Sequence, residues 1–139
     1  MRYINLIFLF FISSNALAAS WIEAGDTIYV DVNSIKKNKG LVFYSSLENM
    51  TTMGLNSVVV TNEANCTEQK VTELDILYYG QPMGQGELVE KKTLNNVKSL
   101  EPNTKKYHAM KFACEKAEWR GFSCFRYSHS VSPVMLLVG

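Results

Sequence analysis

The sequence predicts an α+β domain in which a β-sheet is packed against one C-terminal α-helix. Alternating or β-branched apolar segments recur between residues 28 and 90, whereas helical spacing begins only after Pro102. About 120 residues remain once an N-terminal export signal is set aside, which is enough for one compact domain and too few for two. A sheet with an apolar face needs such a helix to cover it.

Residues 1–18 have the three parts of a cleaved secretory signal. Arg2 precedes an apolar run of seven residues, and residues 16–18 (A-L-A) have the small-x-small pattern that a signal peptidase recognises. The run is much shorter than the ~20 apolar residues of a membrane span. We therefore expect an exported protein that begins at Ala19 or Ser20 and has no membrane span. The alternative is a buried N-terminal helix or strand.

The expected strands are short segments of alternating or β-branched apolar residues. They are residues 28–32, 41–47, 57–61, 71–79 and 87–90. The residues expected to share a face within three of these strands are Ile28, Val30 and Val32, then Leu41, Phe43 and Leu47, and finally Leu74, Ile76 and Tyr78.

The connections between these strands are polar or rich in glycine. Residues 36–40 are expected to form a turn that joins the first two strands as a hairpin. Residues 49–56 show no apolar period and are expected to form a loop. Residues 80–86 contain three glycines and a proline. They predict a turn rather than a phosphate-binding loop, which would also need a lysine and a following helix.

After Pro102 the apolar spacing becomes helical over residues 104–117. The face expected to be buried consists of Tyr107, Met110, Cys114 and Ala117, which follow the i, i+3, i+7, i+10 spacing. Asn103 or Thr104 is expected to cap the start of this helix. Residues 119–139 show no period that separates an edge strand from a tail; we favour a tail, which ends the domain at residue 118.

Three cysteines remain in the exported chain: Cys66, Cys114 and Cys124. An oxidising compartment favours a disulfide in a domain of this size, and three pairings are open. A bond between Cys66 and Cys114 would close a loop of about 48 residues, worth roughly 4 kcal/mol in the chain-entropy model, and would tie the helix to the sheet. No C-x-x-C pair or ligand-spaced histidine predicts a metal site.

The exported chain is electrically balanced and poor in catalytic motifs. The sequence has 14 Lys and Arg against 13 Asp and Glu, and loss of Arg2 leaves 13 of each, which argues against a nucleic-acid-binding protein. No nucleophile, zinc or phosphate motif is present. His108 and Met110 would point in different directions on a helix, so they cannot share a haem iron; we expect Met110 in the core and His108 in solvent. Neither an enzyme nor a cofactor is expected.

Five lysines form a local excess of positive charge. They are Lys91, Lys92, Lys98, Lys105 and Lys106, and only Glu101 opposes them within these 16 residues. The simpler interpretation is a solvated connection between the last strand and the helix. The functional interpretation is a basic patch for acidic proteins or sulfated glycans, in which charge steers the encounter.

A set of short motifs also occurs in a characteristic order along residues 21–115. The set is Trp21-Ile22-Glu23, Tyr29-Val30-Asp31, Ser34-Ile35, Cys66, Tyr78-Tyr79, Met83-Gly84, Gly86, Val89, Pro102-Asn103-Thr104 and Cys114. In this order, behind a signal peptide, the chain resembles the surface-adhesin protein E family of exported proteins from Gram-negative bacteria. The resemblance implies an antiparallel sheet with a C-terminal helix held by a Cys66–Cys114 disulfide, leaving Cys124 free or available for a homodimer.

The resemblance also implies a binding module at the cell surface that captures host matrix or plasma proteins. We therefore expect a non-enzymatic binding domain over residues 19–118, exported to the periplasm or the cell surface, with a protein partner that the sequence does not identify. The alternative is a periplasmic accessory or chaperone-like protein with no host contact.

Overall fold

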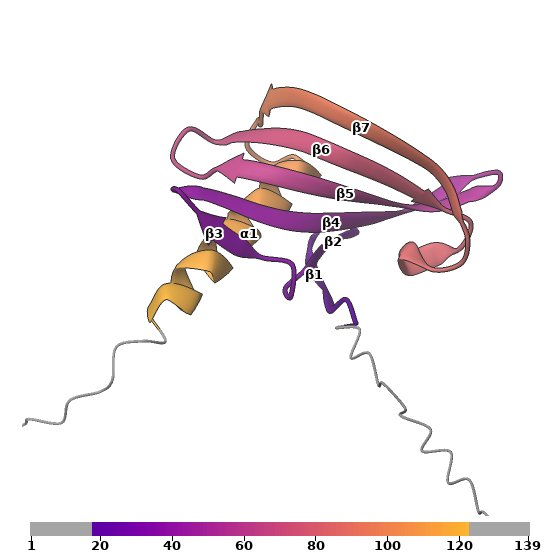
Figure 1. Cartoon of the computed structure of the whole chain (residues 1–139), viewed down its shortest axis with the longest axis horizontal. Coiled ribbons are helices and arrows are strands. Elements are labelled where there is room, and N and C mark those ends of the chain that lie inside the picture. Colours follow the sequence, from indigo (N-terminus) through magenta and orange to yellow (C-terminus); the bar gives the residue numbers. More distant parts are fainter. Residues whose placement is uncertain (1–17, 123–139) are drawn as a thin grey trace, which may run out of the picture.

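The structure, a computed structural model, describes residues 18–122 and contains one antiparallel sheet and one long helix (Figure 1). The strands are β1 (Trp21–Gly25), β2 (Ile28–Asp31), β3 (Lys36–Asn38), β4 (Leu41–Thr52), β5 (Leu55–Asn65), β6 (Lys70–Tyr79) and β7 (Leu88–Ser99). A short 3-10 turn, η1 (Pro82–Gly84), lies between β6 and β7, and the helix α1 (Lys105–Phe122) follows. The predicted α+β class is confirmed.

The strands lie side by side in nearly the order of the chain. The sheet order is β1-β2-β4-β5-β6-β7, and β3 pairs with the first part of β4. Neighbouring strands are antiparallel throughout. This order leaves β1 and β7 as the two edges of the sheet.

Two connections expected to be irregular are instead parts of strands. Lys36–Asn38 form β3, a short exposed strand held to β4 by main-chain pairing, so only the end of the expected 36–40 turn is a turn. Residues 49–56, expected to be a loop, continue β4 and start β5, and Thr52 pairs with Leu55 around a tight hairpin end. Most of these side chains are polar or exposed, and apolar periodicity therefore did not predict that residues 36–38 and 49–56 form strands.

The core lies between α1 and one face of the sheet. It consists of Ile28, Val30, Ile35, Val42, Tyr44, Ala64, Val71, Ala109, Met110, Ala113 and Ala117. Val42 and Tyr44 of β4 face the helix, while Leu41, Phe43 and Leu47 share the opposite face, as the spacing predicts. Leu47 is nevertheless fully buried, because both faces of β4 are covered at this point.

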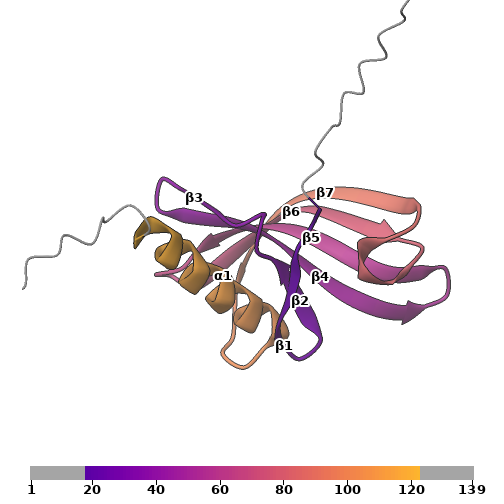
Figure 2. The same ribbon diagram turned by 90° about the horizontal axis from the view of Figure 1, so that it is seen from below.

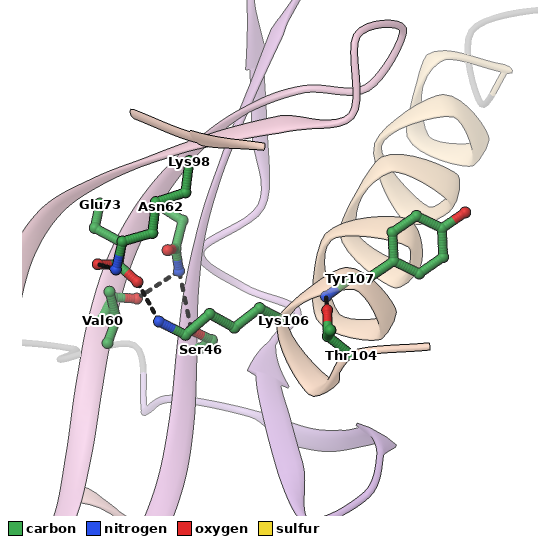
Figure 3. Close-up of polar contacts among 8 residues, drawn as sticks. All are labelled: Ser46, Val60, Asn62, Glu73, Lys98, Thr104, Lys106 and Tyr107. Carbon is green, nitrogen blue, oxygen red and sulfur yellow. Dashed lines mark hydrogen bonds and ion pairs between the residues drawn. The ribbon is translucent and has the colours of Figure 1, made fainter. Parts of the chain in front are cut away.

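The helix crosses one end of the sheet, packing on β1, β2 and β4 (Figure 2). Thr104 caps it as expected, since its Oγ1 accepts a hydrogen bond of 3.3 Å from the backbone N–H of Tyr107 (Figure 3). The buried face is rich in alanine, which lets the helix approach the sheet closely, while Tyr107 and Cys114 are half-buried. The helix continues past residue 118 to Phe122, so residues 119–122 belong to it rather than to a tail.

The disulfide joins Cys66 to Cys114, and this pairing is confirmed. Cys66 follows the end of β5 and Cys114 lies in the middle of α1, with their Cα atoms 6.0 Å apart. Both side chains pack against the core. The expectations for the signal peptide before residue 18, for Cys124 and for residues 123–139 lie outside the described residues.

The expected turn at residues 80–86 is confirmed, and it covers the sheet face opposite to the helix. Gly84 has a φ of +69°, and a Cβ built there would lie 3.2 Å from side-chain atoms of both Leu47 and Val59. The fully buried Ser57 fixes this turn, because its Oγ donates to the carbonyl of Gln81 at 2.6 Å and accepts from the Gly84 N–H at 2.9 Å. The η1 turn is therefore held against this face of the sheet by hydrogen bonds and covers Leu47 and Val59.

Candidate binding site

A hollow lies on the helix-covered face of the sheet, where α1 begins. The helix covers only the end of the sheet near β1 and β2, and the part of β4 to β7 beyond its first turn is not covered by a helix (Figure 1). A small cavity of about 20 Å³ lies at this boundary, between residues of β4, β5 and β6 and the side chains of Lys98 and Lys106. The boundary is the most polar part of an otherwise apolar interior.

Glu73 of β6 lies at the centre of this hollow, and its side chain is only 4 % exposed. Lys98, on the edge strand β7, donates to its Oε2 at 2.8 Å, and Lys106, in the first turn of α1, donates to its Oε1 (Figure 3). One buried carboxylate thus joins β6, β7 and α1. Removing either lysine would leave part of its charge unpaired, which is costly in a buried site.

The two lysines keep Glu73 ionised. Burial alone raises the pKa of the Glu73 carboxyl, but hydrogen bonds from Lys106 and Lys98, together with their charges, outweigh it and leave the pKa below its ordinary value. Near Glu73, burial first and the carboxylate charge second raise the pKa of Tyr44, so the phenol stays neutral. Near neutral pH the hollow therefore contains an ionised Glu73 carboxylate beside a neutral Tyr44 phenol.

Asn62 supports the hollow from β5, directly opposite Glu73. Its Nδ2 donates to the Oγ of Ser46 at 2.9 Å and to the carbonyl of Val60 at 3.0 Å (Figure 3). Asn62 and Ser46 are both buried. The floor beside the carboxylate is thus held by a satisfied polar network, which costs little because its donors have partners.

A β-bulge places Glu73 on the same face of the sheet as Ile76 and Tyr78. Val71 and Glu73 lie on the helix face by the two-residue period of a strand, but the register with β5 shifts between Glu73 and Asp75. Ile76 and Tyr78 therefore return to this same face. The two-residue spacing of Val71 and Glu73 could have shown from the sequence that Glu73 faces the helix. Because of the bulge, however, the same spacing does not place Ile76 and Tyr78 on that face, although they lie there.

The structure brings three of the five expected lysines together. Two of them, Lys98 and Lys106, bind Glu73. The third is Lys105, whose Nζ lies 3.4 Å from the Oε1 of Glu48 and donates to the Oγ1 of Thr27 at 3.2 Å. These lysines line one open hollow of about 620 Å³ at the start of α1.

Lys91 and Lys92 lie further along β7, on opposite faces of the sheet. The Nζ of Lys91 lies 3.7 Å from the Oδ1 of Asp75. The Nζ of Lys92 lies 3.2 Å from the Oε1 of Glu90 and 5.2 Å from the centre of the Tyr78 ring. The five ammonium groups are therefore paired with four carboxylates. The local excess of positive charge that the sequence suggests is thus much smaller in the folded protein, where carboxylates from other parts of the chain lie beside these lysines.

The edge strand β7 is the feature that the sequence missed. Only its first residues were expected to form a strand, yet it is 12 residues long and nearly all its side chains are exposed. Four exposed large apolar side chains lie on it: Leu88, Val89, Leu94 and Val97. Because no part of residues 18–122 covers either face of β7, its polar and apolar residues show no clean alternation.

The described residues offer binding groups rather than a metal centre. Within residues 18–122, no three His, Cys, Asp or Glu side chains lie close enough together to hold a metal ion. His108 was expected in solvent but is half-buried, and it packs so closely on Gly25 that a Cβ added to this glycine would lie 3.5 Å from the Cβ of His108. Met110 is in the core as expected. In this part of the chain, no helix is long and apolar enough to cross a membrane.

The fold and these surfaces define a small disulfide-tethered α+β binding domain. The chain belongs to the surface-adhesin protein E family, whose model matches residues 19–115. The resemblance suggested by the ordered motifs is thereby confirmed. No curated protein sequence matches the chain significantly.

Solved structures of protein E from Haemophilus influenzae have the same fold. A second crystal form of that protein is 22 % identical, with a TM-score of 0.61, over 70 % of this chain and 89 % of the other. A further structure is 23 % identical with a TM-score of 0.58, covering 66 % and 80 %. A structure from a non-typeable strain is 22 % identical with a TM-score of 0.58, covering 73 % and 79 %.

Proposed function

We propose that the protein is a non-enzymatic, exported binding module that captures host matrix or plasma proteins through its edge strand β7. Membership of the surface-adhesin protein E family supports the binding role. The family match begins at residue 19, directly after the A-L-A exit of the expected signal peptide, which supports export. The observation that carries the docking surface is the length and exposure of β7.

β7 offers the two kinds of contact that strand addition needs. Within residues 18–122 it is an edge strand whose main-chain N–H and C=O groups along one side pair with no other strand, and an extended segment of a partner can pair with them. Val89 and Val97, which are 54 % and 61 % exposed, give apolar contacts near the two ends of that pairing. Natural edges of this length are usually protected by charge, and here Lys91 and Lys92 supply it.

These two lysines steer acidic partners more than they fix affinity. Both ammonium groups are about half exposed and pair with carboxylates that are 35 % (Asp75) and 47 % (Glu90) exposed. Such pairs contribute little to stability, so replacing the lysines should leave the fold intact. Attraction between exposed charges is screened beyond ~8 Å at physiological salt, and binding should therefore weaken as salt rises.

Surface plasmon resonance on immobilised vitronectin, laminin and heparin tests this proposal. The double variant Val89→Thr/Val97→Thr keeps β-branched side chains but removes apolar area, and we expect its affinity to fall about tenfold or more. Lys91→Gln/Lys92→Gln should slow association and flatten the salt dependence. Met53→Ser is the matched control, because Met53 is 99 % exposed at the β4–β5 hairpin end, away from β7.

Parental affinity in the threonine double variant would refute β7 as the docking strand. Absence of binding by the parent itself, together with recovery only from the periplasm on cell fractionation, would favour the periplasmic accessory role. The fractionated protein also reports the mature N-terminus by intact mass, which we expect at Ala19 or Ser20. A product that retains residues 1–18 would contradict export.

A further inference from the structure

We propose that the groove next to the start of α1 binds a fatty-acid anion, with its carboxylate at Lys98 and Lys106 and its acyl chain along the sheet. This groove has a volume of about 300 Å³, within the usual range of small-molecule sites. We call it the sheet groove. Its lining consists of Glu48, Met50, Val58, Val60, Glu73, Ile76, Tyr78, Leu94, Lys98 and Lys106.

The floor of the sheet groove is a continuous apolar surface. Val58 and Val60 of β5 lie opposite Tyr78 and Ile76 of β6, and these four side chains are half-buried. Glu73 and Tyr78 pair with Asn62 and Val58 of β5, which are four residue steps apart, so this part of the floor is about 13 Å long at ~3.3 Å per residue. An extended acyl chain can lie along this length and remove both surfaces from water.

One end of the sheet groove carries hydrogen-bond donors that the protein does not fully use. An ammonium group has three donors, and Lys98 and Lys106 each direct one of them to Glu73. Their side chains are 41 % and 44 % exposed, so the other donors can reach a ligand. The carboxylate of Glu48 is paired with Lys105, and the single carboxylate of Glu73 faces two lysines, so the cluster of Glu73, Lys98 and Lys106 carries one net positive charge; Glu101 lines only the outer hollow.

These features favour a fatty-acid anion over other ligands. A neutral apolar molecule would make no use of the free ammonium donors, and a cationic amphiphile would meet a net positive charge. A multiply charged anion would meet the carboxylates of Glu73 and Glu48. An extended peptide would find few main-chain partners, because the floor strands use their N–H and C=O groups within the sheet. The sheet groove is a face of the sheet, and the inference is independent of binding at the β7 edge.

Isothermal titration calorimetry of the full exported chain with monomeric dodecanoate tests the proposal. We expect one dodecanoate to bind per chain, and dodecyltrimethylammonium, which has the same tail and the opposite charge, to bind at least about tenfold more weakly, the factor that 1.4 kcal/mol provides. Equal affinities for the two amphiphiles, or no binding of dodecanoate, would overturn the proposal.

Substitutions locate the head and the tail. Glu73→Gln releases both lysines from their shared carboxylate and should tighten dodecanoate binding, a gain that a misfolded variant would not show. The triple variant Glu73→Gln/Lys98→Gln/Lys106→Gln leaves no buried carboxylate unpaired and should bind the two amphiphiles equally. Unchanged or weaker binding by Glu73→Gln, or retained head-group selectivity in the triple variant, would contradict the assignment.

Val58→Thr/Ile76→Thr makes the floor polar with little change of shape and should weaken binding about tenfold or more. Lys91→Gln is the control, because Lys91 lies on the other face of β7 and its loss should have no effect. Dodecanoate binding that emerges only after Leu136→Ser/Leu137→Ser would instead assign the groove to the chain's own C-terminal segment, and would refute the fatty-acid anion as its occupant.

Discussion

Removing the Cys66–Cys114 disulfide should lower the free energy of unfolding by about 4 kcal/mol. The bond joins residues 48 positions apart. In the chain-entropy model, closing a loop of this length lowers the conformational entropy of the unfolded chain and so raises its free energy by about 4 kcal/mol at 25 °C. The loop contains β6, β7 and the first half of α1. Both cysteines pack against the core, so serine hydroxyls at these positions would add a smaller penalty of the same sign.

Urea unfolding of two matched variants measures this difference. The reference carries Cys124→Ser alone, which removes the third thiol and any alternative pairing, and the test variant adds Cys66→Ser and Cys114→Ser. For a domain of this size the free energy falls by about 2 kcal/mol per molar urea, so the midpoint should fall by about 2 M. Treating the reference with a thiol reductant should reproduce the lower midpoint.

A midpoint shift smaller than about 0.5 M, at an unchanged slope, would refute the loop-entropy reasoning. It would mean that the alanine-rich face of α1 holds the helix on the sheet without help from the bond. A lower slope would have another meaning, because it would show that the unfolded or folded state of the test variant differs in compactness.

Two further substitutions test the polar hollow and the η1 turn. Because Lys98 and Lys106 hold the pKa of Glu73 below its ordinary 4.5, its ionised form stabilises the fold above that pH, and this stability is lost as pH falls through the folded-state pKa. In thermal melts from pH 7 to pH 3, the parent's advantage over Glu73→Gln should therefore begin to shrink below about pH 4.5 and decrease further as the pH falls toward the folded-state pKa, and an advantage that does not change with pH would contradict the assignment. Gly84→Ala should cost about 1–2 kcal/mol for its positive φ plus a packing penalty against the sheet, whereas Gly40→Ala, at a φ of +82° with open space around it, should show the backbone cost alone. Equal losses in urea unfolding would mean that the turn has room to adjust.

Apolar periodicity predicted the elements that bury one clear face. The class, the 71–79 strand, the turn at 80–86 and the helix after Pro102 all depend on such patterns, and each is present. Periodicity placed Leu41, Phe43 and Leu47 on one face of β4, but it did not show that the other face is buried as well: Leu47 lies under the η1 turn, while Val42 and Tyr44 lie under α1. A strand covered on both sides has no single polar face from which to set its phase.

The polar strands and the buried carboxylate needed three-dimensional information. β3 and β7 are exposed along nearly their whole length, so they show no burial pattern. Glu73 depends on lysines 25 and 33 positions away in the sequence, a pairing that only the approach of β7 and α1 to β6 creates. The Cys66–Cys114 pairing came from the family resemblance, because the spacing of three cysteines alone allows three bonds.

The near-sequential strand order has a consequence for how the chain folds after export. Each long strand pairs with one made shortly before it, so β2 to β6 can zip together by successive short loop closures, which are the fast steps of sheet formation. The covering helix comes last, and Cys114 with it. If the N-terminus emerges first, the nascent domain therefore passes through a stage in which the sheet is formed, the apolar face of Ile28 and Val30 is bare, and the thiol of Cys66 awaits its partner. Oxidation at that stage captures the helix on a sheet that is already built, which makes the bond the closing event of folding.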